Sequence, residues 1–131
     1  RFVQAAVAGT PLEIHGDGNQ TRTFCHVQDT IRALQALMDS PETTGEIYNV
    51  GSRNWISIAD LAKRVLELSG SRSEIVYVPY EKVYGTGIDD MLHRLPSIDK
   101  IAAAIGWQPD RTLDEILTDV ISYTRGTAAV A

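Results

Sequence analysis

The stretch that decides the fold covers residues 11–29 and reads PLEIHGDGNQTRTFCHVQD. Apolar and polar residues alternate over 12–15, which is the two-residue period of a half-buried strand. A polar turn with two glycines follows, and TFCHV predicts a second extended run. Asp29 then stands at an N-cap position ahead of apolar residues at helical spacing, namely Ile31, Leu34, Leu37 and Met38. Strand, turn, strand and helix in direct succession predict an α+β fold.

The flanking sequence extends this mixed pattern. RFVQAAVA predicts a helix at the start, Ser57 caps a predicted helix that Gly70 ends, and another helix runs from Ser97 to Gly106. Thr112 and Glu115 form a T-x-x-E capping box for the last helix. GEIYNVGS (45–52) and EIVYVP (74–79) predict two more strands. We therefore expect one small lobe of helices and short strands over residues 1–125 and a frayed tail over 126–131.

Composition excludes several classes of protein. The chain has 131 residues, 44% of them hydrophobic, which suffices for one domain with a core. Its formal net charge of -5 argues against nucleic-acid binding, and no apolar run is long enough to span a membrane. A single cysteine, Cys25, favours a reducing compartment. We expect a cytoplasmic protein without a nucleic-acid or membrane partner.

The beginning of the sequence predicts a truncated protein. The chain starts with RFVQ and not with Met, and its apolar residues are already at helical spacing. We therefore expect this sequence to be a piece of a longer polypeptide.

The glycine-rich turn predicts a fixed anion contact. Gly16 and Gly18 permit unusual backbone conformations, and the polar residues of GDGNQ can hold the turn rigid. Arg22 follows directly, before an apolar run, and its guanidinium suits a phosphate or a carboxylate. The alternative is a structural ion pair with Asp17 or Asp29.

A second irregular segment lies between Pro79 and Pro96, and a loop of that length is often functional. It contains Arg94, just before the N-terminus of a predicted helix, where a shared anion would be favoured. Alternatively, Arg94 pairs with Asp89 or Asp90. Three further polar side chains either contact a ligand or have a structural role, namely Tyr80, Tyr84 and Asn49.

Motifs for catalysis are absent from the sequence. It contains no G-x-S-x-G, no H-E-x-x-H and no glycine-rich phosphate loop that opens a helix. Adjacent Cys25 and His26 would point to opposite faces of an extended segment, so we expect no metal site. On their own, the residues predict an anion pocket without chemistry of its own.

Several segments nevertheless resemble segments of one protein family, and they occur in the same order as in that family. PLEIHGDGNQTRTFCHVQD, GEIYNVGS, ISIADLAKRVLELSG and IGWQPDRTLDEIL resemble the C-terminal substrate-binding region of extended short-chain dehydrogenases/reductases. These are NAD-dependent nucleotide-sugar epimerases, dehydratases and decarboxylases. The segment VYGTGIDDMLHRLPSIDKI is most similar to UDP-glucose 4-epimerase-like enzymes and UDP-glucuronic acid decarboxylases.

The resemblance implies roles for individual residues. It makes Arg22 and Arg94 contacts to the diphosphate or ribose of a UDP-sugar or other NDP-sugar, and it places the strand Glu13, Ile14 and His15 beside the base. In a decarboxylase, Arg22 would also be a candidate proton donor. The same resemblance adds Gln20, Asn49 and Tyr84 to the expected substrate-binding set.

The resemblance also implies what this chain lacks. No tyrosine here has a lysine four residues later, and the sequence has no dinucleotide-binding fingerprint. NAD and the catalytic residues would then belong to an N-terminal α/β Rossmann domain of a parent enzyme, expected to be a homodimer, and the piece alone is expected to be inactive and to bind no cofactor.

Sugar C4 epimerisation is the first expected reaction, UDP-uronic acid decarboxylation the second and dehydration the third. The alternative of another class is a free-standing nucleotide-binding or interaction module without catalysis.

Overall fold

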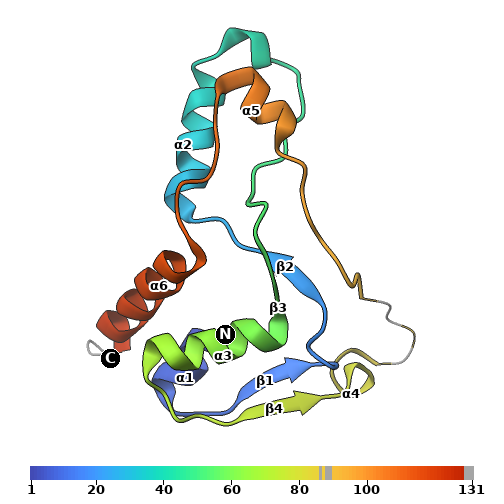
Figure 1. Cartoon of the computed structure of the whole chain (residues 1–131), viewed down its shortest axis with the longest axis vertical. Helices are drawn as coiled ribbons and strands as arrows, with labels where there is room; N and C mark the ends of the chain where they lie inside the picture. Colours follow the sequence, from blue (N-terminus) through green and yellow to red (C-terminus); the bar gives the residue numbers. More distant parts are fainter. Residues whose placement is uncertain (86, 88–89, 129–131) are drawn as a thin grey trace.

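The computed structural model describes residues 1–85, 87 and 90–128 of the chain. It has a broad end and a narrow end (Figure 1). The broad end contains α1 (Phe2–Ala8), β1 (Leu12–His15), α3 (Ile58–Ser69), β4 (Ile75–Val78) and the short α4 (Tyr80–Tyr84). The narrow end contains α2 (Val27–Met38), the 3₁₀ turn η1 (Pro41–Thr43) and α5 (Asp99–Ile105). Between the ends lie β2 (Thr21–Thr23) and β3 (Trp55–Ser57), and α6 (Leu113–Ala128) closes the chain.

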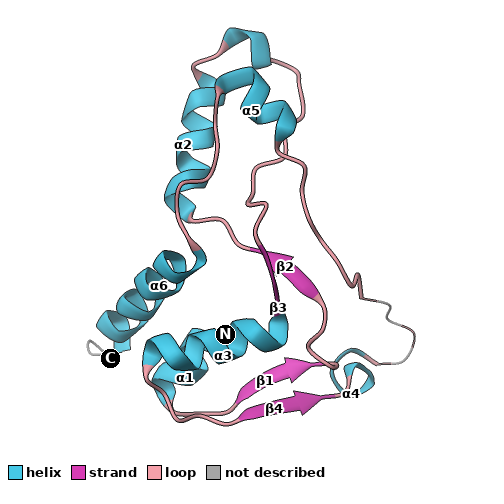
Figure 2. Cartoon of the chain, viewed as in Figure 1, coloured by secondary structure: helices cyan, strands magenta, loops and turns pink. Residues whose placement is uncertain are grey.

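The strands form two small sheets (Figure 2). β1 pairs in parallel with β4, and Leu12 lies opposite Ile75. β2 pairs antiparallel with β3, and Thr21 lies opposite Ser57. An isolated parallel bridge between Thr21 and His93 adds the late irregular segment beside β2. The pairing therefore brings residues 90–93 to the polar turn, about seventy positions earlier in the sequence.

Each end of the molecule has its own hydrophobic core. The core of the broad end is formed by α1, α3, α6 and β1, with Leu12 and Ile14 fully buried. The core of the narrow end joins α2 to α5 through Ala33, Ile101 and Trp107. The predicted α+β lobe is confirmed, because helices and short strands alternate along the chain as expected.

Local caps explain several helix boundaries. Ser57 accepts a hydrogen bond from the backbone amide of Asp60 at 3.0 Å and so caps α3. The Thr112–Glu115 capping box is present, since the Glu115 carboxylate accepts from the Thr112 amide at 2.7 Å. The helix α6 continues to Ala128, and so includes the first three residues of the segment for which a frayed tail was expected. Residues 129–131 lie outside the described part.

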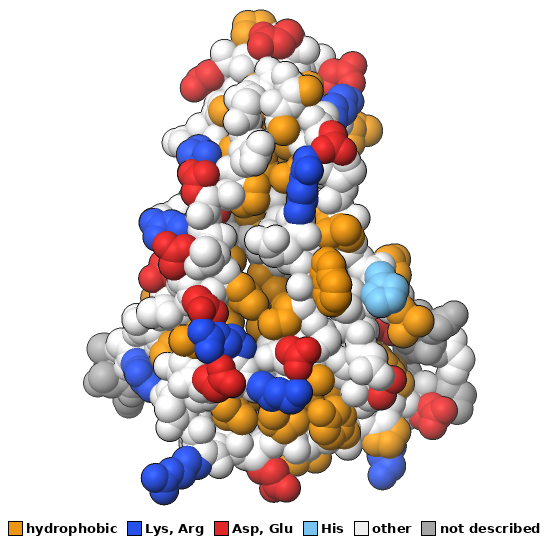
Figure 3. Space-filling view, in the orientation of Figure 1, with side chains coloured by type: hydrophobic (Ala, Val, Ile, Leu, Met, Phe, Trp, Pro, Cys, Tyr) orange, Lys and Arg blue, Asp and Glu red, His pale blue; other side chains and the backbone are white. Residues whose placement is uncertain are grey.

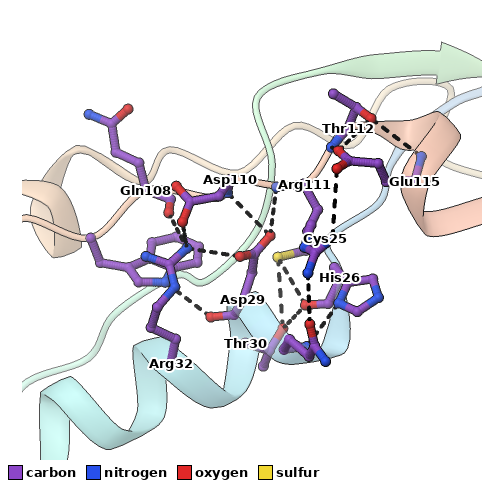
Figure 4. A network of polar contacts seen from close by, with 12 residues as sticks. Cys25, His26, Asp29, Thr30, Arg32, Gln108, Asp110, Arg111, Thr112 and Glu115 are labelled. Atoms are coloured by element: carbon purple, nitrogen blue, oxygen red, sulfur yellow. Dashed lines mark hydrogen bonds and ion pairs between the residues drawn. The ribbon is translucent and has the colours of Figure 1, made fainter. Parts of the chain in front are cut away.

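The expected N-cap at Asp29 is wrong. The helix α2 begins at Val27, and its N-cap is His26, whose Nδ1 accepts from the Gln28 amide at 3.1 Å. Asp29 lies inside the first turn, buried, where it accepts hydrogen bonds from Arg32 and from the backbone at 110–111 (Figure 4). The buried Asp29 carboxylate links α2 to residues 110–111, and this structural role replaces the predicted role as an N-cap.

Two extended segments also differ from expectation. The strand predicted over TFCHV (23–27) is wrong beyond Thr23, because β2 covers Thr21–Thr23 and α2 already begins at Val27. The predicted strand GEIYNVGS has no strand assignment, and within the described residues no neighbouring strand pairs with it. A strand needs a hydrogen-bonding partner, so a sequence with strand character stays irregular when the partner is missing. Its Ile47 side chain is 85% exposed.

Candidate functional site

The turn after β1 is held by hydrogen bonds of its own side chains. Its Asp17 carboxylate accepts hydrogen bonds from the backbone and the side-chain amide of Asn19, at 2.9 and 2.8 Å. These hydrogen bonds lower the pKa of Asp17. Gly16 and Gly18 both have a φ of 78°, in the left-handed region that favours glycine. The expectation that polar side chains hold this turn is confirmed.

The turn also packs closely against its neighbours. A Cβ atom on Gly16 would lie 2.4 Å from a ring carbon of Tyr80, and one on Gly18 would lie 3.0 Å from Ala59. The Gln20 amide donates to the His15 carbonyl at 2.9 Å and to the Tyr80 hydroxyl at 3.1 Å. The two glycines therefore let the turn approach α3 and α4.

Arg22 extends from β2, and all four of its terminal N–H groups have acceptors. Nη1 donates to the carbonyls of Thr21 at 2.8 Å and Met91 at 2.9 Å. Nη2 donates to both carboxylate oxygens of Asp90, each at 2.9 Å. The alternative of a structural ion pair is thus realised, but with Asp90 and not with Asp17 or Asp29.

Tyr80 adds a second donor to the same carboxylate. Its hydroxyl donates to Asp90 Oδ2 at 2.5 Å. This hydrogen bond and the nearby positive charge of Arg22 hold the pKa of Asp90 below its ordinary value. Burial, together with the Asp90 carboxylate, raises the pKa of Tyr80 to about 12. At neutral pH, Asp90 is therefore ionised and Tyr80 is a neutral donor.

Aromatic rings stand beside this anion site. His15 and Tyr84 share a hydrogen bond of 2.9 Å between Nδ1 and the hydroxyl, and their rings meet edge to face with centroids 5.4 Å apart. Tyr80 and Tyr84 stack with centroids 5.7 Å apart. Flat aromatic surfaces of this kind suit a planar ligand group.

These groups line one cavity of about 520 Å³. Its polar end contains five of the predicted substrate-binding residues, namely Glu13, His15, Gln20, Arg22 and Tyr84. Its apolar end is built by side chains of α1, α3 and α6, among them Phe2, Leu61 and Val120. A pocket of a few hundred cubic ångströms with few polar groups is typical of small-molecule sites.

Three predicted residues lie outside the cavity lining. Ile14 is fully buried in the core, so its side chain faces the fold. Asn49 donates to the Ser97 carbonyl at 3.2 Å, which matches the structural interpretation of this residue. Arg94 is exposed, and its predicted partner Asp90 is bound to Arg22 instead. The other predicted partner of Arg94, Asp89, lies outside the described residues.

The late segment meets β2 at Thr21. Thr21 and His93 form a parallel bridge, and their side chains share a 3.0 Å hydrogen bond. Arg94 directly follows His93 in the sequence, but it does not line the cavity.

Sequence reasoning missed two central residues. Asp90 was weighed only as a partner of Arg94, and Tyr80, considered for a ligand contact or a structural role, was not included in the predicted substrate-binding set. Their positions depend on the bridge between β2 and the late segment and on the short helix α4, which local patterns did not predict.

Within the described residues, the structure has no cluster of three potential metal ligands and no helix long and apolar enough to cross a membrane.

Comparison with known proteins decides the family. The sequence family described as GDP-mannose 4,6 dehydratase matches residues 1–120. This chain belongs to that family. It is thereby a member of the NAD-dependent epimerase/dehydratase group of extended short-chain dehydrogenases/reductases, as the resemblance implied.

Individual members of the group show the range of reactions. The chain is 38% identical, over 95% of its length, to UDP-N-acetyl-alpha-D-glucosaminuronate decarboxylase of Bacillus cytotoxicus, of which it covers 39%. UDP-glucose 4-epimerase of Thermotoga maritima, solved with UDP-glucose, has a TM-score of 0.85 at 27% identity, with 97% of this chain and 38% of that chain covered. UDP-glucuronic acid 4-epimerase of Bacillus cereus, solved with UDP-glucuronic acid and NAD, has a TM-score of 0.85 at 25% identity, with 97% and 39% covered. The chain therefore spans about two fifths of the length of these relatives.

Proposed function

We propose that this chain is the nucleotide-sugar-binding lobe of a longer NAD-dependent enzyme, and that its cavity holds the nucleotide diphosphate of a UDP-sugar. The observation that carries the proposal is the convergence of Arg22 and the Tyr80 hydroxyl on one anionic group, at the polar end of the cavity. A guanidinium and a hydroxyl aimed at one anion form the kind of contact that recognises phosphate.

The remaining lining residues fit the rest of a nucleotide. His15 and Tyr84 offer aromatic surface and hydrogen-bonding groups for a planar base, and Glu13 lies on the same strand as His15. Arg94 directly follows His93, the bridge partner of Thr21, and would supply a second positive charge for the diphosphate. The solved relatives with bound UDP-glucose or UDP-glucuronic acid support a ligand of this class.

The residues of this chain do not fit the cofactor. NAD in this family requires a glycine-rich turn between a strand and a helix, and the sequence has none. In the described part of the chain, β1 and β4 pair in parallel, but no helix begins directly after β1. We place NAD and the Tyr-x-x-x-Lys residues in another part of the proposed parent enzyme, and this chain alone would be inactive.

An exposed apolar surface on α2 is evidence for a further domain that covers it. On α2, the residues Val27, Ile31, Leu34 and Met38 form one stripe, and their side chains are 47–84% exposed. The segment 45–50, which has no strand partner among the described residues, carries the exposed Ile47. Elsewhere, hydrophobic side chains reach the surface between the broad and narrow ends (Figure 3). We propose that the Rossmann domain of the parent covers the α2 stripe and pairs with residues 45–50 as a strand.

Decarboxylation of a UDP-uronic acid is the reaction to test first, because the relative with 38% identity is a decarboxylase of such a substrate. The full-length protein with NAD would be incubated with UDP-glucuronic acid and UDP-N-acetylglucosaminuronic acid, and the products followed by proton NMR. Loss of the C6 carboxylate to give a UDP-pentose supports this reaction.

Epimerisation at C4 is the second candidate, supported by the likeness to the Thermotoga maritima enzyme. With UDP-glucose as the substrate in the same assay, conversion to UDP-galactose would support epimerisation. If UDP-sugars are bound but not consumed, a nucleotide-binding module without catalysis becomes the better interpretation, and if they are not bound either, an interaction module does.

A further inference from the structure

We propose that Asp90 is an internal competitor for the anion site, and that the phosphate of a ligand replaces its carboxylate on Arg22 and Tyr80. The proposal rests on the proposed function, because it takes the ligand to be a nucleotide diphosphate. It makes Asp90 the residue that sets the affinity of the site for phosphate.

The hydrogen bonds of Arg22 leave no free pair of donors for a ligand. Its two Nη1 hydrogens are used by the carbonyls of Thr21 and Met91, and its Nη2 group is used by the Asp90 carboxylate. Only the Nε–H group of Arg22 has no acceptor among the described residues. A phosphate that accepts two parallel hydrogen bonds from Arg22 must therefore displace one of these partners.

Asp90 is the partner that a ligand can replace. The two carbonyls belong to paired backbone, since the Thr21 amide donates to the Leu92 carbonyl at 2.8 Å and Thr21 bridges to His93. The Asp90 side chain is 30% exposed and lines the cavity. An anionic side chain at the wall of an open cavity can be exchanged for a ligand anion without unpairing a strand.

Displacement of Asp90 would release two donors together. The Arg22 Nη2 group and the Tyr80 hydroxyl both point at Asp90 Oδ2, at 2.9 and 2.5 Å. A phosphate oxygen at that position would accept both hydrogen bonds. The position of the carboxylate is thus the expected position of the ligand anion. The apparent affinity for the ligand equals the intrinsic affinity multiplied by the fraction of molecules in which the carboxylate does not occupy the site.

The test is calorimetric titration of the full-length protein with UDP and, separately, with uridine. Asp90→Asn keeps the size of the side chain and removes its charge, and Asp90→Ala removes the group. Both variants are expected to bind UDP about three- to tenfold more tightly. Uridine, which has no phosphate, is expected to bind with unchanged affinity.

Two controls separate competition from a general effect of charge. Asp114 forms a comparable pair with Arg64 outside this cavity, at 2.8 and 2.5 Å, so Asp114→Asn should leave UDP affinity unchanged. In an Arg22→Ala, Tyr80→Phe background, Asp90→Ala should give no gain, because neither of the two donors is left to compete for. A gain that persists in that background would show simple relief of repulsion and would overturn the proposal.

The remaining outcomes distinguish this inference from the proposed function. If wild type binds UDP and neither Asp90 variant binds it more tightly, although melting curves show both folded, the competitor role is wrong and the proposed function stands. If wild type shows no binding but Asp90→Ala does, competition is supported. If none of these proteins binds UDP, the nucleotide site itself is wrong, and the competitor role with it.

Discussion

The indole Nε1 of Trp107 donates a 3.0 Å hydrogen bond to the backbone carbonyl of Asp29, and both residues are only 3% exposed. The Asp29 carboxylate accepts from Arg32 at 2.8 Å and from the backbone amides of Asp110 and Arg111 at 3.3 and 3.1 Å (Figure 4). Burial raises the pKa of Asp29, but these hydrogen bonds outweigh it, and the pKa lies below its ordinary value. Asp29 therefore ties α2 to the segment that leads into α6.

The first prediction concerns this tie. Asp29→Asn should lower the free energy of unfolding by about 2 kcal/mol at pH 7, because it removes a buried charge-assisted acceptor. A group with a lowered folded pKa stabilises the fold above its unfolded pKa, and this stability is lost as the pH falls through the folded pKa. The difference between variant and wild type in urea unfolding should therefore shrink below about pH 4.

Asp39→Asn is the control for this prediction, since Asp39 is exposed at the end of the same helix. It should change the unfolding free energy by less than about 0.5 kcal/mol. An Asp29→Asn variant as stable as wild type at pH 7 would show that the carboxylate does not hold the two segments together.

The second prediction concerns the turn beside the site. Gly16→Ala should destabilise the protein by about 2 kcal/mol or more, because a Cβ at a φ of 78° is strained and would also meet the Tyr80 ring. Gly70→Ala is the matched control, with a φ of 64° but open space around the added methyl group. Thermal melts of both variants should show the larger loss at Gly16, and equal losses would mean that the turn does not pack on Tyr80.

Local sequence patterns predicted most of the fold. The helices α1, α3, α5 and α6 and the strands β1 and β4 lie where periodicity placed them, because each element carries its own apolar spacing. Local patterns failed where contacts with a distant segment determine the structure. Asp29 looked like a cap but is buried against residues 107–111, and GEIYNVGS has strand character without a described partner strand.

The site was predicted in part for the same reason. Arg22 and its turn were recognisable because their chemistry is local, and five of the eight predicted binding residues line the cavity. Asp90 was not recognisable as the partner of Arg22, since 68 positions separate them and only the bridge at Thr21 brings them together. Whether the predicted residues bind a nucleotide stays a prediction.

The third prediction tests the proposed covering domain. Met38→Asp and Ile47→Asp, at side chains 84% and 85% exposed in this chain, should lower the melting temperature of the full-length protein by several degrees. In the chain alone, the same changes should alter stability by less than about 0.5 kcal/mol, since both side chains already face water. Equal and small effects in both proteins would show that nothing covers this surface.

The fourth prediction concerns the second arginine. Arg94→Ala should weaken UDP binding by at least a few-fold, because Arg22 and Arg94 each directly follow one member of the Thr21–His93 bridge, and a second guanidinium near the diphosphate would add a charge-assisted contact. If both arginines bind one diphosphate, the loss of binding free energy in the double variant, measured by calorimetry, should differ from the sum of the two single losses. Strictly additive losses would argue for two separate sites.

The most direct test of the nucleotide site is the affinity of the full-length protein for UDP with and without the Arg22 guanidinium. Removing a charge-assisted pair to a phosphate costs about 1.5 to 3 kcal/mol, or roughly ten- to a hundredfold in affinity. Calorimetry of Arg22→Ala should show a loss in this range for UDP and little change for uridine. An unchanged UDP affinity in a folded Arg22→Ala protein would contradict the assignment of this cavity as a nucleotide diphosphate site.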